Sequence, residues 1–449
     1  MKKTFAILTL LFIVHHTAFG QNSFIGIQNS QRKSIHSVWM NPAEINHLHK
    51  KIEVNFFSVQ GSFGNNIISF QDVLKDREDV LNLAFERADG PVNVRSNIEI
   101  IGPSIGFKMD RWAFGISTQA FASGHMIDLD PKLAESFSSN NFTGRSNIIN
   151  INSPFNQRVN ISGWTEIGFT AGFELIRLAE HSLSVGGTYK LLFPYNYINV
   201  GVNQINGTLV QNDFEFSLTN TTGRVNLSYA DEALDAGSFT FSVNPFNFSQ
   251  LSGYGVDLGA NYKWKDPQGG SKLNAGLALR NIGQMRFGRN QTNNTYNINI
   301  PEGESFRIDQ LEGSLEEINQ QLVNSGYFSI DRQREGVLTN LPTLISAYGE
   351  LKLSKSFYMS LYGQQRFNSQ NDNNQLVAQN ILVLTPRLLF GNFEIYSPWT
   401  SYEVAGITGG LGLRYGGFFL GSNSIITGLI ADTKQADFHI GLSWGFGNN

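Results

Sequence analysis

The chain has 449 residues, of which 45 are Gly, 35 are Phe and none is Cys. Charged residues make up 16% of the sequence, below the usual quarter or so, which indicates that much of the surface does not face bulk water. The net charge of −4 argues against the broad basic surface that nucleic-acid binding requires. The absence of cysteine excludes disulfides, thiolate nucleophiles, iron–sulfur clusters and Cys-based zinc sites.

Residues 1–20 have the pattern of a secretory signal peptide. Lys2-Lys3 is followed by an apolar run, Phe5 to Val14, that is too short to span a bilayer. Cleavage is expected after Ala18-Phe19-Gly20, and an N-terminal anchor helix is the less favoured alternative because His15-His16 ends the run. No later stretch approaches about 18 consecutive apolar residues, so we expect an exported chain that is either soluble or a β-barrel.

From about residue 51 onward the apolar residues recur with a period of two. Residues 254–265 alternate between Tyr, Val, Leu, Ala and Trp on one face and Gly, Asp, Asn and Lys on the other, and residues 273–280 repeat the pattern after a turn. These runs match the roughly 9–11 residues of a membrane-spanning strand better than the five or six of a soluble strand. An apolar face tipped with aromatics and a polar second face indicate lipid outside and a wet lumen inside, whereas a soluble sandwich or adhesin needs a densely apolar inner face.

Short turns divide these strands into hairpins. The expected turns are 110–111, 177–181, 266–270, 354–355, 391–392 and 416–417, with a first strand near 51–59 and a last strand near 437–446. They predict about fourteen strands, an even number as in closed single-chain barrels. The fold class is therefore all-β, a transmembrane antiparallel β-barrel over residues 51–449 whose long connections are 61–97, 125–162, 194–253 and 283–342. Short turns opposite long loops indicate periplasmic turns, extracellular loops and both termini in the periplasm.

Several long connections carry patterns of their own. Helical spacing over residues 71–88, 131–137 and 306–323 predicts helices that cap the barrel mouth rather than bind a partner. Residues 203–247 are expected to extend a β-hairpin above the membrane. The aromatics Phe239, Phe241, Phe246 and Phe248 either line an apolar vestibule or form the core of the loop cap, and the sequence favours neither.

The segment 21–50 is too irregular for a strand and too mixed for a disordered tail. It precedes the first strand and contains Asn41, Pro42 and Ala43, which we take as the candidate gate of a plug inside the lumen. A periplasmic lead-in that packs only against the barrel rim is an equal alternative.

A set of charged residues is expected to point from the polar strand faces into the lumen. Its members are Glu166, Glu174, Asp257, Lys263, Arg280 and Arg414. They would either tune permeation or form mixed-sign pairs that fill a closed barrel, and the near balance of signs favours the second interpretation.

The sequence offers no clear catalytic or metal site. Glu44, His47 and His49 lie close together, but we expect a solvated polar run there rather than a metal cluster. No nucleophile elbow, phosphate-binding loop or zinc-protease motif occurs, so we predict no enzymatic activity and no cofactor.

The opening segment and several later motifs carry a family resemblance. Phe24-Ile25-Gly26-Ile27, Val38 to Ile45 with its Asn-Pro-Ala element, Leu341-Pro342-Thr343 and Gly410 to Phe418 resemble an uncharacterised Bacteroidota family of outer-membrane barrels. More distantly, the chain resembles long-chain fatty-acid transporter barrels and the related shuttle barrel of type IX secretion. This resemblance implies that Asn41, Pro42 and Ala43 belong to a lumen hatch, whereas no ligand-contacting residue can be matched.

These patterns predict a monomeric outer-membrane barrel. The leading hypothesis is binding or passage of a hydrophobic or amphipathic small molecule, gated by the plug. The alternative is a closed structural or assembly barrel that is a partner of a secretion, motility or surface protein complex. The expected partners are outer-membrane lipid and, during biogenesis, the barrel-assembly machinery, which reads a C-terminal strand with outward aromatics such as Asp437 to Phe446.

Overall fold

A computed structural model provides the structure of the chain. It describes residues 24–75, 80–131, 147–153, 155–212, 215–229, 248–267, 270–288, 292–313, 315–333, 336–369 and 372–447. The expected signal peptide, the expected helix after Pro131 and three of the candidate vestibule aromatics, Phe239, Phe241 and Phe246, lie outside these residues. In the described part, no helix is long and apolar enough to cross a membrane.

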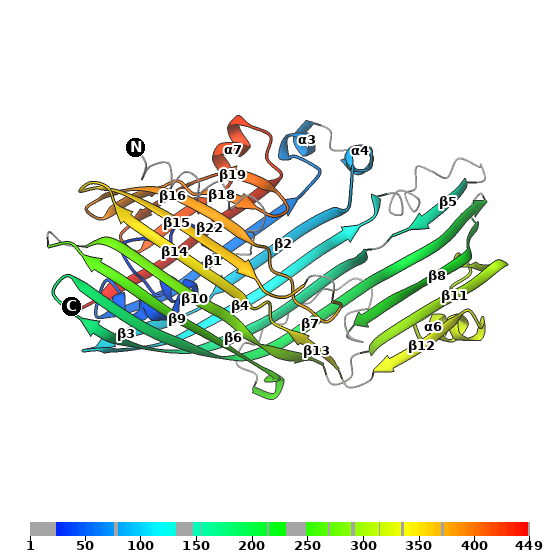
Figure 1. Ribbon diagram of the computed structural model, residues 1–449, viewed down its shortest axis with the longest axis horizontal. Coiled ribbons are helices and arrows are strands. Elements are labelled where there is room, and N and C mark those ends of the chain that lie inside the picture. The colour runs from blue at the N-terminus through cyan, green and yellow to red at the C-terminus, as the bar shows by residue number, and fades with distance from the viewer. Residues whose placement is uncertain are drawn as a thin grey trace, which may run out of the picture.

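The fold is a closed antiparallel ring of 14 strands, as predicted (Figure 1). In ring order the strands are β1 (Ile52–Asn65), β2 (Val92–Ile101) continued by β3 (Ser104–Met109), β4 (Trp112–Leu129), β6 (Asn156–Arg177), β7 (His181–Asn212), β9 (Gly253–Lys265), β10 (Ser271–Phe287), β13 (Val337–Asn340) continued by β14 (Leu344–Lys352), β15 (Phe357–Arg366), β16 (Ile381–Phe390), β17 (Phe393–Tyr396) continued by β18 (Trp399–Tyr402), β19 (Gly406–Gly409) continued by β20 (Leu411–Tyr415), β21 (Phe418–Ser422) and β22 (Gln435–Phe446). Pairing of β22 with β1 closes the ring, from Ile52 opposite Phe446 to Gly64 opposite Gln435.

Each short turn predicted from the sequence connects two neighbouring strands of the ring. They all lie at one end of the barrel, where β1 begins and β22 ends. Turns at this end use left-handed backbone, with φ of 54° at Asp110 and 53° at Gly391.

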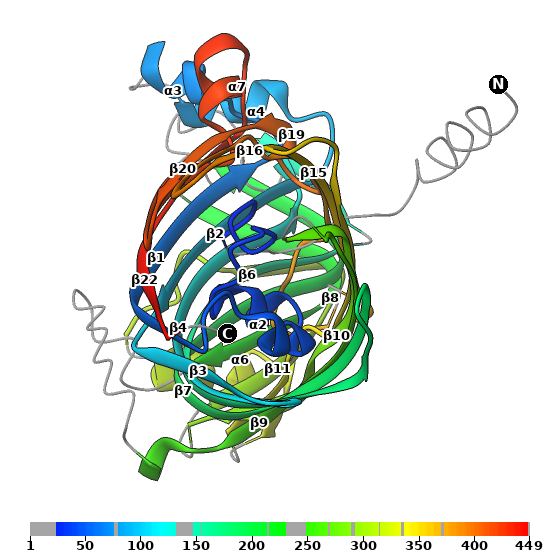
Figure 2. The ribbon, with the colours of Figure 1, turned by 90° about the vertical axis from the view of Figure 1, so that its left-hand side faces the viewer.

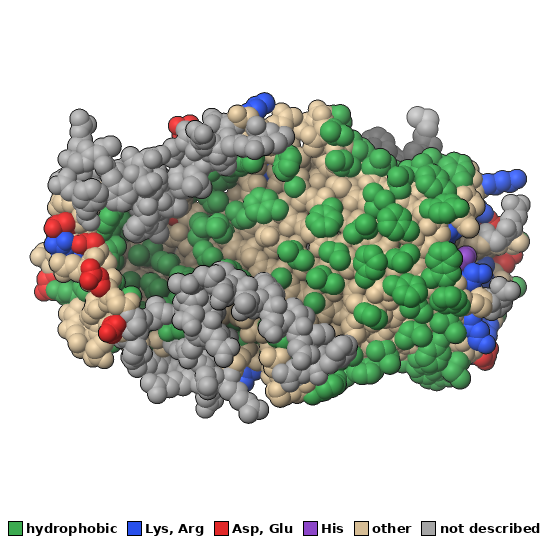
Figure 3. Space-filling model, turned by 180° about the vertical axis from the view of Figure 1, so that it is seen from behind, with side chains coloured by type: hydrophobic (Ala, Val, Ile, Leu, Met, Phe, Trp, Pro, Cys, Tyr) green, Lys and Arg blue, Asp and Glu red, His purple; other side chains and the backbone are tan. Residues whose placement is uncertain are grey.

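The outer face of the ring is apolar, as the alternation predicted. On β9, Tyr254 and Leu258 are 48% and 52% exposed, whereas the inward Asp257 and Asn261 are 3% and 0% exposed. Apolar side chains cover the wall of the barrel in Figure 3 and give way to charged side chains at its turn-bearing end. A continuous exposed apolar band around a closed β ring is typical of a surface that faces lipid.

The wall is much taller on one side than on the other. β6 and β7 are 22 and 32 residues long, whereas β21 has 5 residues. The connections expected at 194–253 and 283–342 are therefore wrong in part, because β7 and β8 (Glu215–Tyr229) occupy much of the first, and β11 (Thr292–Arg307) and β12 (Phe328–Gln333) much of the second. Likewise β1 continues to Asn65 and β4 to Leu129, within the expected loops 61–97 and 125–162.

The tall side carries a projecting sheet at the far right of Figure 1. It consists of β5 (Asn147–Asn152), the distal half of β7, β8, β11 and β12, with helix α6 (Leu315–Asn324) beside β12. The expected hairpin over 203–247 thus exists as the pair β7 and β8, which then pairs with β11. An apolar cluster that includes Leu209, Ile298 and Phe328 gives this sheet its own core.

The other predicted helices are present in shorter form. Residues 71–88 contain α3 (Phe70–Lys75) and α4 (Val80–Arg87), and residues 306–323 contain α6 only after β11 has ended at Arg307. A further helix, α7 (Ile425–Ile430), connects β21 to β22. In Figure 1, α3, α4 and α7 lie together above the short side of the wall.

Residues 24–50 lie inside the ring, which confirms the plug and excludes a segment that packs only on the rim (Figure 2). The plug contains α2 (His36–Met40) and the 3-10 helix η1 (Pro42–His47). Its apolar side chains are buried against the inner wall: Phe24, Ile25, Ile27, Ile35, Val38, Met40, Ile45 and Leu48. Each such side chain contributes about 1.5–3 kcal/mol of burial free energy, so the plug is a packed part of the fold.

Candidate functional site

The Asn-Pro-Ala element is the point at which the plug meets the tall wall. Asn41 caps η1, with its Oδ1 accepting from Ala43 N at 2.9 Å, and Pro42 occupies the first helical position. The other half of the Asn41 amide donates to the carbonyl oxygen of Ala260 on β9 at 2.8 Å and to Tyr348 Oη on β14 at 3.3 Å. One side chain therefore both starts the helix and attaches it to the barrel.

A row of glycines on the inner wall receives this element. Gly172 on β6 pairs with Gly186 on β7, which pairs with Gly259 on β9. A Cβ at Gly186 would lie 2.6 Å from the carbonyl carbon of Pro42 and 2.7 Å from Ala43 N, both backbone atoms. A Cβ at Gly259 would lie 1.9 Å from Asn41 Oδ1. The wall thus lacks side chains where the plug backbone approaches it.

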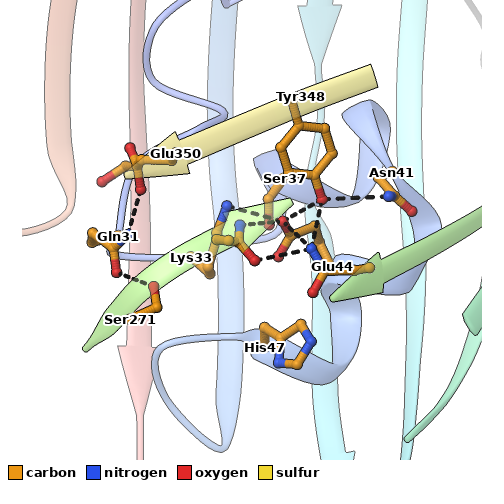
Figure 4. Close-up of polar contacts among 12 residues, drawn as sticks. Gln31, Lys33, Ser37, Asn41, Glu44, His47, Ser271, Tyr348 and Glu350 are labelled. Carbon is orange, nitrogen blue, oxygen red and sulfur yellow. Dashed lines mark hydrogen bonds and ion pairs between the residues drawn. The ribbon is translucent and has the colours of Figure 1, made fainter. Parts of the chain in front are cut away.

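Glu44, one residue after the Asn-Pro-Ala element, is the centre of a buried polar network (Figure 4). Its Oε1 lies 3.0 Å from Lys33 Nζ and accepts hydrogen bonds from Tyr348 Oη at 2.5 Å and Asn274 Nδ2 at 2.8 Å. Burial alone would raise the pKa of Glu44, but the Lys33 ammonium and these hydrogen bonds outweigh it and lower the pKa to about 2. The carboxylate is therefore ionised and links the plug to two strands of the wall.

A second polar contact group attaches the start of the plug to the short wall. Arg387 on β16 forms ion pairs with Glu350 and Glu394 and donates to the Gly26 carbonyl oxygen at 2.5 Å. Ser30 Oγ donates to Glu394 Oε2 at 2.7 Å. In the same region Gln31 donates to Glu350 and accepts from Ser271 Oγ at 2.8 Å. The two contact groups thus attach the plug to a run of consecutive strands of the ring, from β10 to β17.

The charged residues predicted to point into the lumen lie in three different environments, and the first is a buried group of ion pairs. Glu166 and Asp257 are buried and flank Lys190 on β7, with Nζ to carboxylate distances of 3.6 and 2.9 Å. Lys190 was not singled out from the sequence, although it alternates inward on the same strand pattern.

Arg280 and Arg414 contact the plug itself. Arg280 Nη1 donates to the Trp39 carbonyl oxygen at 2.7 Å, and Arg414 Nη1 donates to the Arg32 carbonyl oxygen at 2.9 Å. Both guanidinium groups thereby satisfy backbone acceptors of a segment that has little regular structure.

Glu174 and Lys263 lie at the turn-bearing end. Glu174 pairs with Arg177, and both line an open cavity with Lys263, Asn46 and His47. The structure thus brings Glu166 together with Asp257 around Lys190 and places Glu174 and Lys263 around one open cavity, whereas Arg280 and Arg414 make separate contacts with the plug.

The expectation of a solvated polar run near Glu44 is wrong. Glu44 is fully buried and His47 is half-buried, and only His49 of the three is exposed. Within the described residues, no group of three His, Asp or Glu side chains is arranged to hold a metal ion.

A small cavity lies directly beyond the plug, on its side away from the short turns. Gln60 and Tyr402 line it, and both touch the plug: Gln60 accepts from Phe24 N, and Tyr402 packs in the cluster with Ile25. Glu99, which pairs with Gln60 across β1 and β2, continues the lining with Phe121 and Trp164, whose rings stack with centroids 4.6 Å apart. The cavity therefore combines aromatic walls with polar groups, and two of its lining side chains contact the plug.

Sequence reasoning found the plug and its Asn-Pro-Ala element but missed this cavity and the ionic contacts of Lys33 and Arg387. Gln60 and Glu99 are register partners on consecutive strands of the ring, whereas Tyr402 lies more than 300 residues further along the chain. The only signal available was their inward position in an alternating strand, which many other residues share.

One family model matches the chain over residues 42–423, and its description is "Family of unknown function (DUF5723)". The chain belongs to this family. The match begins within the Asn-Pro-Ala element, so the family includes both the end of the plug and nearly all of the ring. No curated protein matches the sequence.

Several solved barrels are similar in fold. A Pseudomonas aeruginosa FadL homologue is 12% identical, with a TM-score of 0.43 and coverage of 95% of this chain and 99% of that chain. The CymD monoaromatic hydrocarbon channel is 11% identical, with a TM-score of 0.43 and coverage of 96% and 95%. The Ralstonia pickettii toluene transporter TbuX is 9% identical, with a TM-score of 0.40 and coverage of 92% and 94%. At these scores the evidence for the fold is the strand pairing of this chain itself.

Proposed function

We propose that this protein is an outer-membrane barrel that binds an amphipathic small molecule in the cavity beyond the plug and passes it when the plug moves. The observation that carries the proposal is the position of the cavity. Its lining comes from the barrel, and two of the lining side chains, Gln60 and Tyr402, contact the plug at Phe24 and Ile25. A molecule in it would contact Gln60 and Tyr402, and through these two side chains its binding would be coupled to the position of the plug.

The mixed chemistry of the cavity supports an amphipathic ligand. Phe121 and Trp164 offer apolar surface, whereas Glu99, Gln60 and Tyr402 offer polar atoms. Binding sites for small molecules commonly combine apolar walls with a few placed polar groups. The apolar exterior of the ring supports placement in an outer membrane, with the short turns in the periplasm.

Reversible tethering of the plug tests the passage step. The chain has no cysteine, so a Gln31→Cys/Ser271→Cys variant carries only the introduced thiols, at side chains whose polar atoms lie 2.8 Å apart. A short reducible thiol cross-linker would then fix the plug to β10. The readout is the rate at which N-phenyl-1-naphthylamine, an amphipathic aromatic dye, enters cells that express the protein.

We expect wild-type expression to raise the rate of dye entry several-fold, cross-linking of the tethered variant to abolish the increase, and reductant to restore it. The control is Thr170→Cys/Thr188→Cys, whose hydroxyls lie 2.8 Å apart within the wall and do not involve the plug. Equal dye entry with the plug tethered and free would contradict passage by plug movement.

A second candidate function follows from the projecting sheet. The projecting sheet lies beyond the band expected in the membrane and has its own apolar core. A barrel does not need such a unit to close its extracellular end. We propose that a protein partner binds there if the barrel is a closed assembly component. Gentle extraction followed by native mass spectrometry tests this proposal. We expect a stoichiometric protein adduct on the wild-type barrel. The adduct should disappear when residues 292–333 are replaced by a short linker.

A further inference from the structure

The cavity beyond the plug contains an excess of unpaired acceptors. Glu99 Oε2, Gln379 Oε1, Asn423 Oδ1 and Gln435 Oε1 have no hydrogen-bond partner among the residues that the structure describes. All four side chains line the cavity, and each is at most 5% exposed. A buried polar atom without a partner costs about 1–3 kcal/mol, so four acceptors around one space indicate a missing donor.

The arrangement of neighbouring groups explains why these oxygens remain unpaired. Gln119 Nε2 donates to Glu99 Oε1 at 3.0 Å, which leaves Oε2 as the unpaired atom. Asn423 Nδ2 donates to Tyr402 Oη at 3.5 Å, which leaves the Asn423 oxygen without a donor. The carboxylate and these amides therefore present acceptors to the cavity.

From this geometry we infer that the cavity binds a protonated amine, with Glu99 as the counter-ion and the amide oxygens of Gln379, Asn423 and Gln435 as hydrogen-bond acceptors. The inference deepens the proposed function, on which it rests, by naming the polar end of the ligand. An ammonium group carries three donors and no acceptor, which complements this set. The rings of Phe121, Trp164 and Tyr402 add faces that attract a cation.

The size and charge of the cavity favour an ammonium group over the other cations. Its volume of about 60 Å³ accommodates a few water-sized groups, hence a small head group rather than a whole lipid. A calcium ion needs 6–8 oxygen ligands, commonly with several carboxylates. Among the described residues that line this cavity, Glu99 is the one carboxylate.

Titration calorimetry on the purified full-length barrel in detergent tests the inference, with n-butylammonium as the probe. The isosteric controls are n-butanol and butyrate, and calcium chloride is a separate titrant. We expect n-butylammonium to bind at least tenfold more tightly than either organic control and more tightly than calcium. Equal binding of n-butanol or butyrate, or tighter binding of calcium, would overturn the assignment.

The Glu99→Gln variant removes the charge and keeps the shape. We expect at least tenfold weaker binding of n-butylammonium, whereas Glu86→Gln on the exposed face of α4 leaves binding unchanged. Unaltered binding by folded Glu99→Gln would also overturn the inference. If that variant does not fold, the selectivity of the wild-type protein for the ammonium probe decides the question alone. The plug remains in place in these titrations, so a failed dye-entry test leaves amine binding intact, and failed amine binding leaves plug gating intact.

Discussion

Glu44 is the residue whose loss should weaken attachment of the plug most. Substitution by Gln removes the charge that pairs with Lys33 and leaves a buried ammonium uncompensated, since both side chains are at most 2% exposed. Breaking a buried pair in this way costs about 3–5 kcal/mol. We expect Glu44→Gln to lower amide hydrogen-exchange protection in residues 24–50 while the strands of the ring keep theirs.

A partly exposed ion pair between α3 and α4 provides the matched control. Arg87 and Asp72 lie 2.6 Å apart with exposed fractions of 45% and 13%, and exposed pairs contribute about 0.2–1 kcal/mol. Asp72→Asn should leave exchange in the plug unchanged. An equally small effect of Glu44→Gln would mean that the Glu44 pair does not hold the plug.

Attachment of the plug should also depend on pH through Glu44. Its pKa in the folded protein, about 2, is lower than the ordinary value of 4.5, so the ionised form favours the attached plug. The contribution is fully present above pH of about 4.5 and is lost as the pH falls toward 2. We expect exchange protection of the wild-type plug to decrease over this range, after correction for intrinsic exchange rates. In Glu44→Gln this part of the pH dependence should be absent, and its persistence would assign it to another group.

At the level of elements, the glycine row should be intolerant of side chains. A methyl group at Gly186 would meet plug backbone atoms, which cannot rotate away as a flexible side chain can. Overpacking of this kind costs typically about 1–3 kcal/mol. We expect Gly186→Ala to displace the Asn-Pro-Ala element and to increase proteolysis within residues 24–50.

Gly349 on β14 is a suitable control for this substitution, because a Cβ there has no neighbour within 4 Å. Gly349→Ala should leave proteolysis of the plug at the wild-type rate. If Gly186→Ala increases proteolysis of the plug no more than Gly349→Ala does, the glycine row does not position the plug.

The elements differ in how far the sequence predicted them. The ring strands were predictable because lipid on one face and the lumen on the other impose a strict period of two, as on β9. The sequence predicts loops over parts of the distal half of β7 and of β8, β11 and β12. This prediction fails because outside the membrane both faces of a strand tolerate polar residues. In the plug, the helix start at Asn41-Pro42 is a local pattern that the sequence shows directly. The partners of Glu44 are not local, because Asn274 and Tyr348 lie more than 200 residues away from it in sequence.

At the scale of the molecule, the ring and the plug are held by different interactions. Backbone ladders close the ring, including the β1 and β22 pair, and none of these ladders involves residues 24–50. The plug adds side-chain contacts and a buried apolar surface inside a wall that is already closed. The ring should therefore form without the plug. In that case, water would hydrate charged side chains of the inner wall such as Arg387.

Deletion of residues 24–49 tests this separation. We expect the shortened chain to assemble into a folded barrel, because the strand pairing is complete without the plug, and to conduct ions in planar bilayers, because water enters the vacated lumen. The wild-type protein should show little conductance, since its plug is packed against the wall on several sides. Restored closure on addition of a peptide of residues 24–49 would show that the plug alone blocks the lumen. A deleted barrel that folds but stays closed would place the barrier in the projecting sheet or the loops instead, and would favour the closed assembly barrel over a gated passage.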